Sequence, residues 1–270
     1  MTDEQTDFLH TAVVAAQEAA RIHRFHIGGD LDVATKSNET DLVTKVDKMC
    51  EQRIRDLILE RYPHHTVLGE EMGGPGSDAQ GNEAEYRWIV DPLDGTVNYA
   101  HGFPFYCVSI ALEIRGKVEV GVVLDSAHHE MFSAVRGNGA YLDGAPMRTS
   151  GESDPARAML ATGFAYDPDR LVENSHVFMR VLPHVRAIRR PGAAALDLCY
   201  VAAGRLDAFW EITLNAWDVA AGVLIVEEAG GRVTTGNGDP YRLDDPVLIA
   251  SNGWLHEPLV ELLALHDIKA

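Results

Sequence analysis

Two carboxylates, Asp91 and Asp94, stand three residues apart in the segment Asp-Pro-Leu-Asp-Gly-Thr at residues 91–96. At about 4 Å and an effective dielectric constant of about 20, two such charges repel by about 4 kcal/mol, which a shared proton or a cation would relieve. All-oxygen ligands favour a hard cation such as Mg²⁺, and the free amides of Gly95 and Thr96 at a helix start would face an anion. These residues are typical of a phosphate-processing site. The alternative is a turn that ends a strand, with Asp94 as an ordinary helix cap.

A strand and a turn would position these residues. Residues 88–90, Trp-Ile-Val, form a short apolar run with a β-branched centre, which predicts a buried strand. We expect this strand to end at Asp91-Pro92, because proline has no amide hydrogen to donate within a sheet. Gly95 lets the backbone bend, and Thr96 could cap the helix or turn that follows.

Further acids occur at the ends of other predicted elements. Glu70 and Glu71 end a predicted strand at residues 65–71, although such a pair is also common on surfaces. Asp41 and Asp47 lie in and after a polar loop that leads into a helix, where they could be turn and N-cap residues. Asp218 stands where another helix is predicted to begin, so an N-cap would also explain it.

The segment at residues 91–99, Asp-Pro-Leu-Asp-Gly-Thr-Val-Asn-Tyr, resembles the signature of the inositol monophosphatase family of Mg²⁺-dependent, lithium-sensitive phosphatases. Three other blocks agree with it in order and spacing: Asp-Leu-Val-Thr-x-x-Asp at 41–47, Gly-Glu-Glu at 69–71, and the region from Gly192 to Trp-Asp at 217–218. Two departures bear on the specificity for the alcohol. Ala193 stands where relatives often have Ser or Thr, and Pro191 precedes Gly192.

The resemblance implies a role for each residue of these blocks. The ligands of two or three Mg²⁺ ions would be Glu70, Asp91, the carbonyl of Leu93, Asp94 and Asp218. The residues that position and deprotonate the attacking water would be Glu70, Thr96 and Asp47. The phosphate would be held by the amides of Gly95 and Thr96. The substrate contacts would be Asp94, Gly192, Ala193, Ala194, Glu211 and Asp218.

The activity implied is Mg²⁺-dependent hydrolysis of a small polyol phosphate, most simply inositol 1-phosphate, by direct attack of metal-activated water. Alternatives within the superfamily are fructose 1,6-bisphosphate, histidinol phosphate and a 3′-phosphonucleotide. Few basic residues stand beside the motifs, which argues against a second phosphate. A phosphoaspartate enzyme ranks lower, because such enzymes typically have Asp-x-Asp. From another class, a regulatory protein that binds the transcription machinery remains open.

The composition bounds the partners and the location. The net charge of −18 argues against non-specific binding to nucleic acid or to an anionic membrane. Cys50, Cys107 and Cys199 are far apart, which favours a reducing compartment. No apolar run reaches about 18 residues, and the N-terminus does not resemble a signal peptide. We therefore expect a cytoplasmic protein without a membrane segment.

The 270 residues predict a mixed α+β or α/β chain, and the resemblance implies a layered αβαβα sandwich that forms a homodimer. A composition shift at 149–155 predicts two domains: residues 1–150 with the Gly-Glu-Glu and Asp-Pro-Leu-Asp-Gly-Thr motifs, and residues 151–270 with Trp-Asp and the hydroxyl contacts. Periodicity predicts helices at 4–26, 46–62, 171–185, 194–203, 219–229 and 257–265. Further strands are predicted at 107–114, 118–124, 131–135, 140–142, 158–164, 186–190, 208–211 and 247–250. His23, His26 and the cluster His128-His129-Glu130 are interpreted as surface residues.

Overall fold

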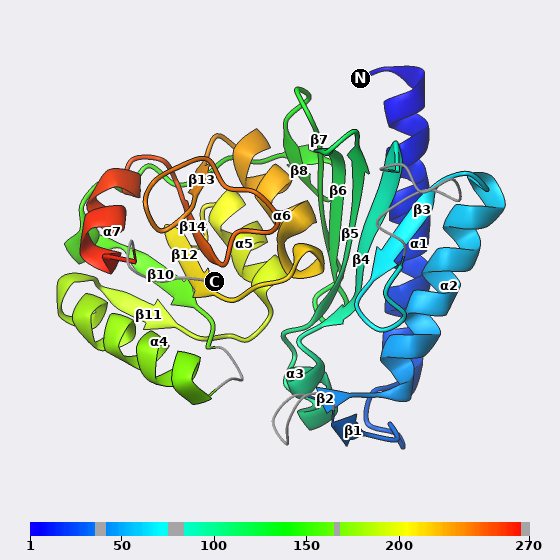
Figure 1. Ribbon diagram of the computed structural model, residues 1–270, viewed down its shortest axis with the longest axis horizontal. Helices are drawn as coiled ribbons and strands as arrows, with labels where there is room; N and C mark the ends of the chain where they lie inside the picture. The colour runs from blue at the N-terminus through cyan, green and yellow to red at the C-terminus, as the bar shows by residue number, and fades with distance from the viewer. Residues whose placement is uncertain (36–41, 75–83, 165–167, 266–270) are drawn as a thin grey trace.

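The structure, a computed structural model, describes residues 1–35, 42–74, 84–164 and 168–265. Figure 1 shows five alternating layers of helix and sheet. The helical layers are α1 (Asp3–His26) with α2 (Lys45–Arg61), α5 (Ala194–Ala202) with α6 (Ala216–Glu228), and α4 (Pro168–Val181) with α7 (His256–Leu263). A seven-stranded sheet separates the first pair from the second, and a five-stranded sheet separates the second pair from the third. The expected αβαβα sandwich is confirmed.

The seven-stranded sheet follows chain order. Its strands are β3 (Thr66–Gly69), β4 (Tyr86–Asp94), β5 (Cys107–Ile114), β6 (Lys117–Asp125), β7 (Glu130–Val135), β8 (Ala140–Leu142) and β9 (Ala145–Pro146). Helices cover both faces of β5 and β6, which explains their nearly continuous apolar sequences. Only β3 and β4 run parallel in this sheet, with Gly69 opposite Val90. This pairing brings Glu70 beside Asp91 at the same edge.

The five-stranded sheet has the order β11 (Ala187–Arg189), β10 (Met159–Thr162), β12 (Ala208–Ile212), β14 (Val247–Ser251) and β13 (Arg232–Thr234). Strand β10 is parallel to β11 and to β12, whereas β14 is antiparallel to both of its neighbours. Thr162 lies opposite Trp210, so Gly163 and Glu211 follow side by side. The sheet thereby carries these two residues to one place. Strand β13 was not predicted.

The middle layer packs against both sheets. One core cluster contains Ile89 and Val123 of the first sheet, Leu198 and Val219 of the middle helices, and Phe209 of the second sheet. The two sheets come from residues on either side of position 150, but they share this core. The division of the chain into two domains stays a prediction.

The chain crosses Pro92 without leaving the sheet, so the expectation that the strand ends at Asp91-Pro92 is wrong. Strand β4 continues to Asp94. Its pairing with β3 stops at Val90, and its register with β5 shifts between Asp91 and Asp94. The missing amide hydrogen of Pro92 therefore costs no ladder hydrogen bond, because the strand bulges there.

Two groups interpreted as surface residues have structural partners. His23 is completely buried, with Nε2 at 2.9 Å from the Pro92 carbonyl oxygen and Nδ1 at 2.8 Å from the Ser126 hydroxyl. Since a carbonyl can only accept, Nε2 carries the proton and Ser126 donates to Nδ1. Glu130 begins β7 and forms a two-pronged ion pair with Arg205, at 2.5 and 2.6 Å. The surface interpretation is wrong for His23, whereas the Glu130 side chain remains 25% exposed.

Smaller elements complete the fold. These are the two-stranded sheet of β1 (Ala34–Thr35) and β2 (Leu42–Val43), helix α3 (Thr96–His101), and 3₁₀ turns at Pro155–Arg157 and Leu182–His184. The last turn contains Pro183, which explains why α4 ends before the predicted boundary. Asp41 and most of the Gly-rich loop before Glu85 lie outside the described residues. In the parts of the chain that the structure describes, no helix has the length and apolar character needed to cross a membrane.

Candidate active site

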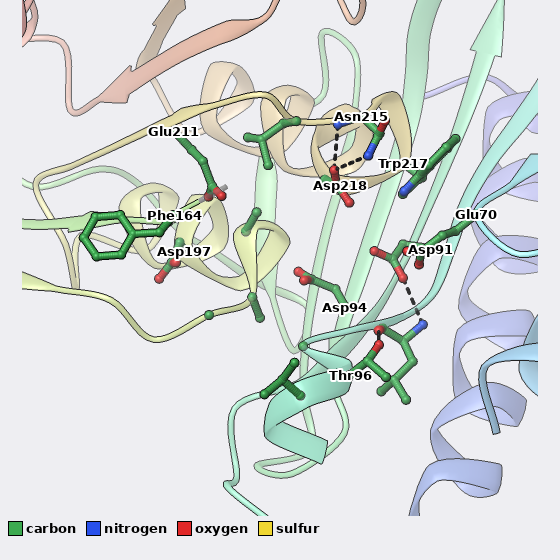
Figure 2. Close-up of a pocket in the computed structure, with 18 of the residues that line it drawn as sticks. Glu70, Asp91, Asp94, Thr96, Phe164, Asp197, Glu211, Asn215, Trp217 and Asp218 are labelled. Carbon is green, nitrogen blue, oxygen red and sulfur yellow. Dashed lines mark hydrogen bonds between the residues drawn. The ribbon is translucent and has the colours of Figure 1, made fainter. Parts of the chain in front are cut away.

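A cavity of about 420 Å³ opens where the edge of the seven-stranded sheet meets the N-terminal ends of α3, α5 and α6. Four carboxylates face this cavity from three elements (Figure 2). Glu70 directly follows β3, Asp91 and Asp94 belong to β4, and Asp218 lies in the first turn of α6. The fold thus gathers acids that are separated by as many as 148 residues, 218 minus 70.

The acids of the cavity raise one another's pKa. Asp91 is only 2% exposed, and burial raises the pKa of its carboxyl well above the usual value. The charges of Glu70, Asp94 and Asp218 raise that pKa further. Burial, reinforced by Glu70, also raises the pKa of Asp94 to about 7, although the Ala195 amide opposes this by donating to Asp94 Oδ2 at 2.8 Å. A bound cation would offset this accumulation of negative charge.

The donor chemistry of the cavity fits a hard divalent cation. The four side chains offer only oxygen, and the backbone folds at Leu93, whose amide donates to Asp91 Oδ1 at 3.0 Å. Within the described residues, no three His, Cys, Asp or Glu side chains already enclose one ion. An open donor set suits Mg²⁺, which usually takes one or two carboxylates and completes its shell with water and phosphate oxygen.

A hydroxyl and a buried acid lie beside the carboxylates. Thr96 Oγ1 lies 3.0 Å from Asp47 Oδ1 and 2.9 Å from the Leu93 carbonyl oxygen, and its single proton can go to only one of them. Asp47 is fully buried, and its Oδ2 accepts from the amide and hydroxyl of Thr44 at 2.8 and 2.6 Å. Asp47 is not among the residues that line the cavity, and it contacts one of them, Thr96.

Helix α3 begins at the cavity. Gly95 is its N-cap, in the left-handed region at φ 90°, and a Cβ there would lie 2.8 Å from the Phe105 carbonyl oxygen. Only glycine fits this position without strain. The expectation that Thr96 caps the helix is wrong, because Thr96 is the first helical residue. The amides of Gly95 and Thr96 have no acceptor within the helix, and both residues line the cavity.

Asp218 is the third helical residue of α6 rather than its N-cap. The N-cap is Asn215, whose backbone amide donates to Asp218 Oδ2 at 2.6 Å (Figure 2). This bond, from the N-cap amide to the side chain of the third helical residue, is part of a capping box, and it fixes the position of the Asp218 carboxylate. Its carboxylate stays at the positive end of the helix, facing the other acids.

The cavity is also lined by small residues and by a further acid. Gly192, Ala193 and Ala194, at the start of α5, lie there as predicted, together with Glu211 of β12. Burial, followed by the charge of Asp218, raises the pKa of Glu211 to about 8.

Several cavity residues were not assigned to the site from the sequence, among them Gly163, Phe164, Arg190 and Asp197. Arg190 is the basic residue among these four, and its charge opposes the rise in the pKa of Glu211. Its position two residues before Gly192, a residue assigned to the site, could have indicated that Arg190 lies near the cavity. Asp197 follows Ala193 by about one helical turn, which also could have indicated it.

All of the residues assigned to the site from the sequence line this cavity except Asp47, which stands behind Thr96. Their individual roles stay predictions.

The comparisons with known proteins agree with this geometry. A model of the inositol monophosphatase family matches residues 4–266. A protein named Nus factor SuhB from Pasteurella multocida is 41% identical over 246 residues, 90% of each chain. Inositol monophosphatase 2 from Solanum lycopersicum is 40% identical over 260 residues, 95% of this chain and 98% of the relative.

A solved structure extends the agreement to the fold. The inositol monophosphatase from Anabaena (Nostoc) sp. PCC 7120 superposes with a TM-score of 0.86 at 38% identity, covering 97% of this chain and 96% of that one. Sequence and fold therefore agree over almost the whole length. This chain belongs to the inositol monophosphatase family and is a metal-dependent phosphatase of that superfamily.

Proposed function

We propose that this chain is a Mg²⁺-dependent phosphomonoesterase that hydrolyses a small polyol phosphate, most simply inositol 1-phosphate. The observation that carries the proposal is the convergence of Glu70, Asp91, Asp94 and Asp218 on one cavity bordered by three helix N-termini. Carboxylates can hold cations, and helix N-termini favour the anion that those cations bind. A phosphate monoester satisfies both groups.

The site residues have separate roles in this proposal. Glu70, Asp91, Asp94, Asp218 and the Leu93 carbonyl would hold two or three Mg²⁺ ions. When bound, these ions would neutralise charge on the phosphate and make a nearby water more acidic. The amides of Gly95 and Thr96 would bind the phosphate oxygens.

Thr96 and Asp47 act on the attacking water. When the Thr96 hydroxyl donates to Asp47 Oδ1, its oxygen is left to accept a hydrogen bond from water and so to orient that water. Thr44 donates to the other oxygen of Asp47, so Oδ1 is left to accept from Thr96. Glu70 would take up the proton of the water. The distal acid Glu211 would accept hydrogen bonds from hydroxyl groups of the substrate.

Phosphate release from a panel of monoesters, with and without Mg²⁺, tests the proposal. The panel contains inositol 1-phosphate, fructose 1,6-bisphosphate, histidinol phosphate and a 3′-phosphonucleotide. We expect Mg²⁺-dependent release, strongest from inositol 1-phosphate, and inhibition by millimolar Li⁺. The variant Asp91→Asn should lose nearly all turnover while keeping its circular-dichroism spectrum. Turnover that does not change with Asp91→Asn would overturn the metal assignment.

A second candidate, binding to the transcription machinery, is retained because one relative is named a Nus factor. The chain itself, immobilised and exposed to purified transcription proteins with and without competing RNA, tests this candidate. Retention of a partner by Asp91→Asn as well as by the natural chain would favour it, especially if no monoester is hydrolysed. The homodimer, the cytoplasmic location and the absence of direct nucleic-acid or membrane partners also stay predictions. Sedimentation velocity tests the first of these.

A further inference from the structure

Asp197 is a buried acid, and one of its two carboxyl oxygens has no hydrogen-bond partner in the described structure. Its side chain is 1% exposed, and Oδ1 is the oxygen without a partner. Asp125 is equally buried, but its carboxylate accepts from the amides of Ala127 and His128, each at 2.9 Å, and lies 2.8 Å from His128 Nδ1. Buried polar groups in native proteins normally have partners, so a bare carboxyl oxygen requires an explanation. The explanation must lie in the cavity, because Asp197 lines it.

The surroundings of Asp197 form a built pocket rather than a random gap. Figure 2 shows Asp197, Glu211 and Phe164 together at one end of the cavity, opposite the four-carboxylate cluster. Gly163 forms the wall beneath Glu211. A Cβ at Gly163 would lie 2.0 Å from the Glu211 carboxyl carbon, so the absence of a side chain there makes the space for this acid.

Arg190 adds a positive charge to the lining of the same cavity. Its guanidinium carbon lies 6.0 Å from the centre of the Phe164 ring, and its charge acts on both Asp197 and Glu211. The residue is exposed, so it offsets part of the acidity without filling the pocket. The interior of the pocket still presents two carboxyl groups and bare backbone.

Two neighbouring carboxyl groups determine which kind of ligand this pocket can bind. Both present oxygen atoms, which bind hydroxyl groups well. We propose that Asp197, paired with Glu211, determines specificity by binding the hydroxyl groups of the polyol that lie away from the phosphate. This inference rests on the proposed phosphatase function and names the part of the site that recognises the alcohol.

The experiment compares two substrates across matched variants. Inositol 1-phosphate has distal hydroxyls, whereas 4-nitrophenyl phosphate has none. In Asp197→Ala we expect KM for inositol 1-phosphate to rise about 10-fold, as for one lost hydrogen bond to a carboxyl group. We expect kcat for inositol 1-phosphate, and kcat/KM for 4-nitrophenyl phosphate, to stay within about twofold. The control Asp125→Asn changes an equally buried acid outside the cavity and should leave the ratio of the two kcat/KM values unchanged.

Three results would overturn the assignment. An unchanged KM for inositol 1-phosphate in Asp197→Ala would show that this acid does not bind the polyol. Equal losses with both substrates would indicate a structural role. Faster turnover of histidinol phosphate than of inositol 1-phosphate, with the same dependence on Asp197, would assign the pair to an ammonium group instead.

Equilibrium binding separates this inference from the phosphatase function. Calorimetric titration of the natural chain and of Asp197→Asn with inositol, in the presence of Mg²⁺ and phosphate, needs no turnover. Weaker binding of inositol by Asp197→Asn would support the assignment even if no monoester were hydrolysed. Equal affinities would overturn it, whatever the activity. Asp197→Asn keeps the size of the side chain, so it answers the question if Asp197→Ala fails to fold.

Discussion

The carboxylate cluster should destabilise the protein whenever no cation is bound, and Asp94→Asn measures this cost. Burial and Glu70 raise the pKa of Asp94 from 3.8 to about 7. In the unfolded chain the carboxyl group releases its proton at the lower value. The folded state therefore holds a proton that the unfolded state releases, and stability falls as the pH rises from about 4 to about 7.

The size of the effect follows from the shift in pKa. A shift of about 3 units corresponds to about 4 kcal/mol, which is an upper limit because side chains and water relax around buried charges. Asparagine cannot ionise, and its side-chain oxygen can still accept from the Ala195 amide. At pH 7.5 without Mg²⁺, Asp94→Asn should therefore be more stable than the natural chain by up to about 4 kcal/mol, or roughly 8 °C in Tm. At pH 4.5 the two proteins should be almost equal.

Saturating Mg²⁺ should narrow this difference in stability. A ligand at 100 times its Kd stabilises the folded state by about 2.7 kcal/mol. We expect the natural chain to gain about this amount from saturating Mg²⁺, and Asp94→Asn to gain much less because one ligand is missing. The variant should also lose its Mg²⁺-dependent turnover.

Chemical denaturation at the two pH values, in EDTA and in MgCl₂, measures all four combinations. Asp125→Asn is the control, since it removes a buried charge outside the cavity and should keep the full response to Mg²⁺. The reasoning is refuted if Asp94→Asn in EDTA at pH 7.5 is no more stable than the natural chain and shows the same gain from Mg²⁺.

Three other substitutions test separate parts of the argument. Thr96→Val removes the hydroxyl that lies 3.0 Å from Asp47 Oδ1 and should lower kcat by about 100-fold; steady-state kinetics that show an unchanged kcat would contradict its proposed role. Gly163→Ala places a Cβ 2.0 Å from the Glu211 carboxyl carbon, so KM for inositol 1-phosphate should rise more than KM for 4-nitrophenyl phosphate. Burial lowers the pKa of His23 from 6.5 to about 4, so its contribution is fully present above pH 6.5 and should be lost as the pH falls to about 4, by about 3 kcal/mol. In urea denaturation, His23→Gln should show a shallower fall over this range, and an identical fall would exclude His23 as the cause.

The sequence alone determined the local chemistry of the site. The Asp-Pro-Leu-Asp-Gly-Thr segment identified both acids of β4, and helical periodicity placed Asp218 at the start of α6. The burial of His23 could also have been predicted from the sequence. It follows Ala16, Ala19 and Ala20 on one face of α1, and all of these residues are buried. Helical spacing records which residues share a face, so the pattern carried this information although the interpretation of His23 as a surface residue did not use it.

The tertiary structure decided which of these faces meet. The parallel pairing of β3 with β4 sets Glu70 beside Asp91, and the pairing of β10 with β12 sets Gly163 beside Glu211. Neither register can be predicted from the local sequence pattern. A period of two or of 3.6 residues determines which side of an element a side chain is on, but it does not determine which strand pairs with that element.

The continuation of β4 through Pro92 could not be predicted from the sequence either. Local propensity forbids proline in a central strand, but here the neighbouring strands leave that position unpaired. The assembly of Asp197, Arg190 and Glu211 into one pocket likewise depends on how the middle helices pack between the two sheets. Sequence determined the kind of chemistry, because side-chain types and local spacing carry it. Only the fold decided the shape of the substrate pocket, because that shape arises from contacts between residues distant along the chain.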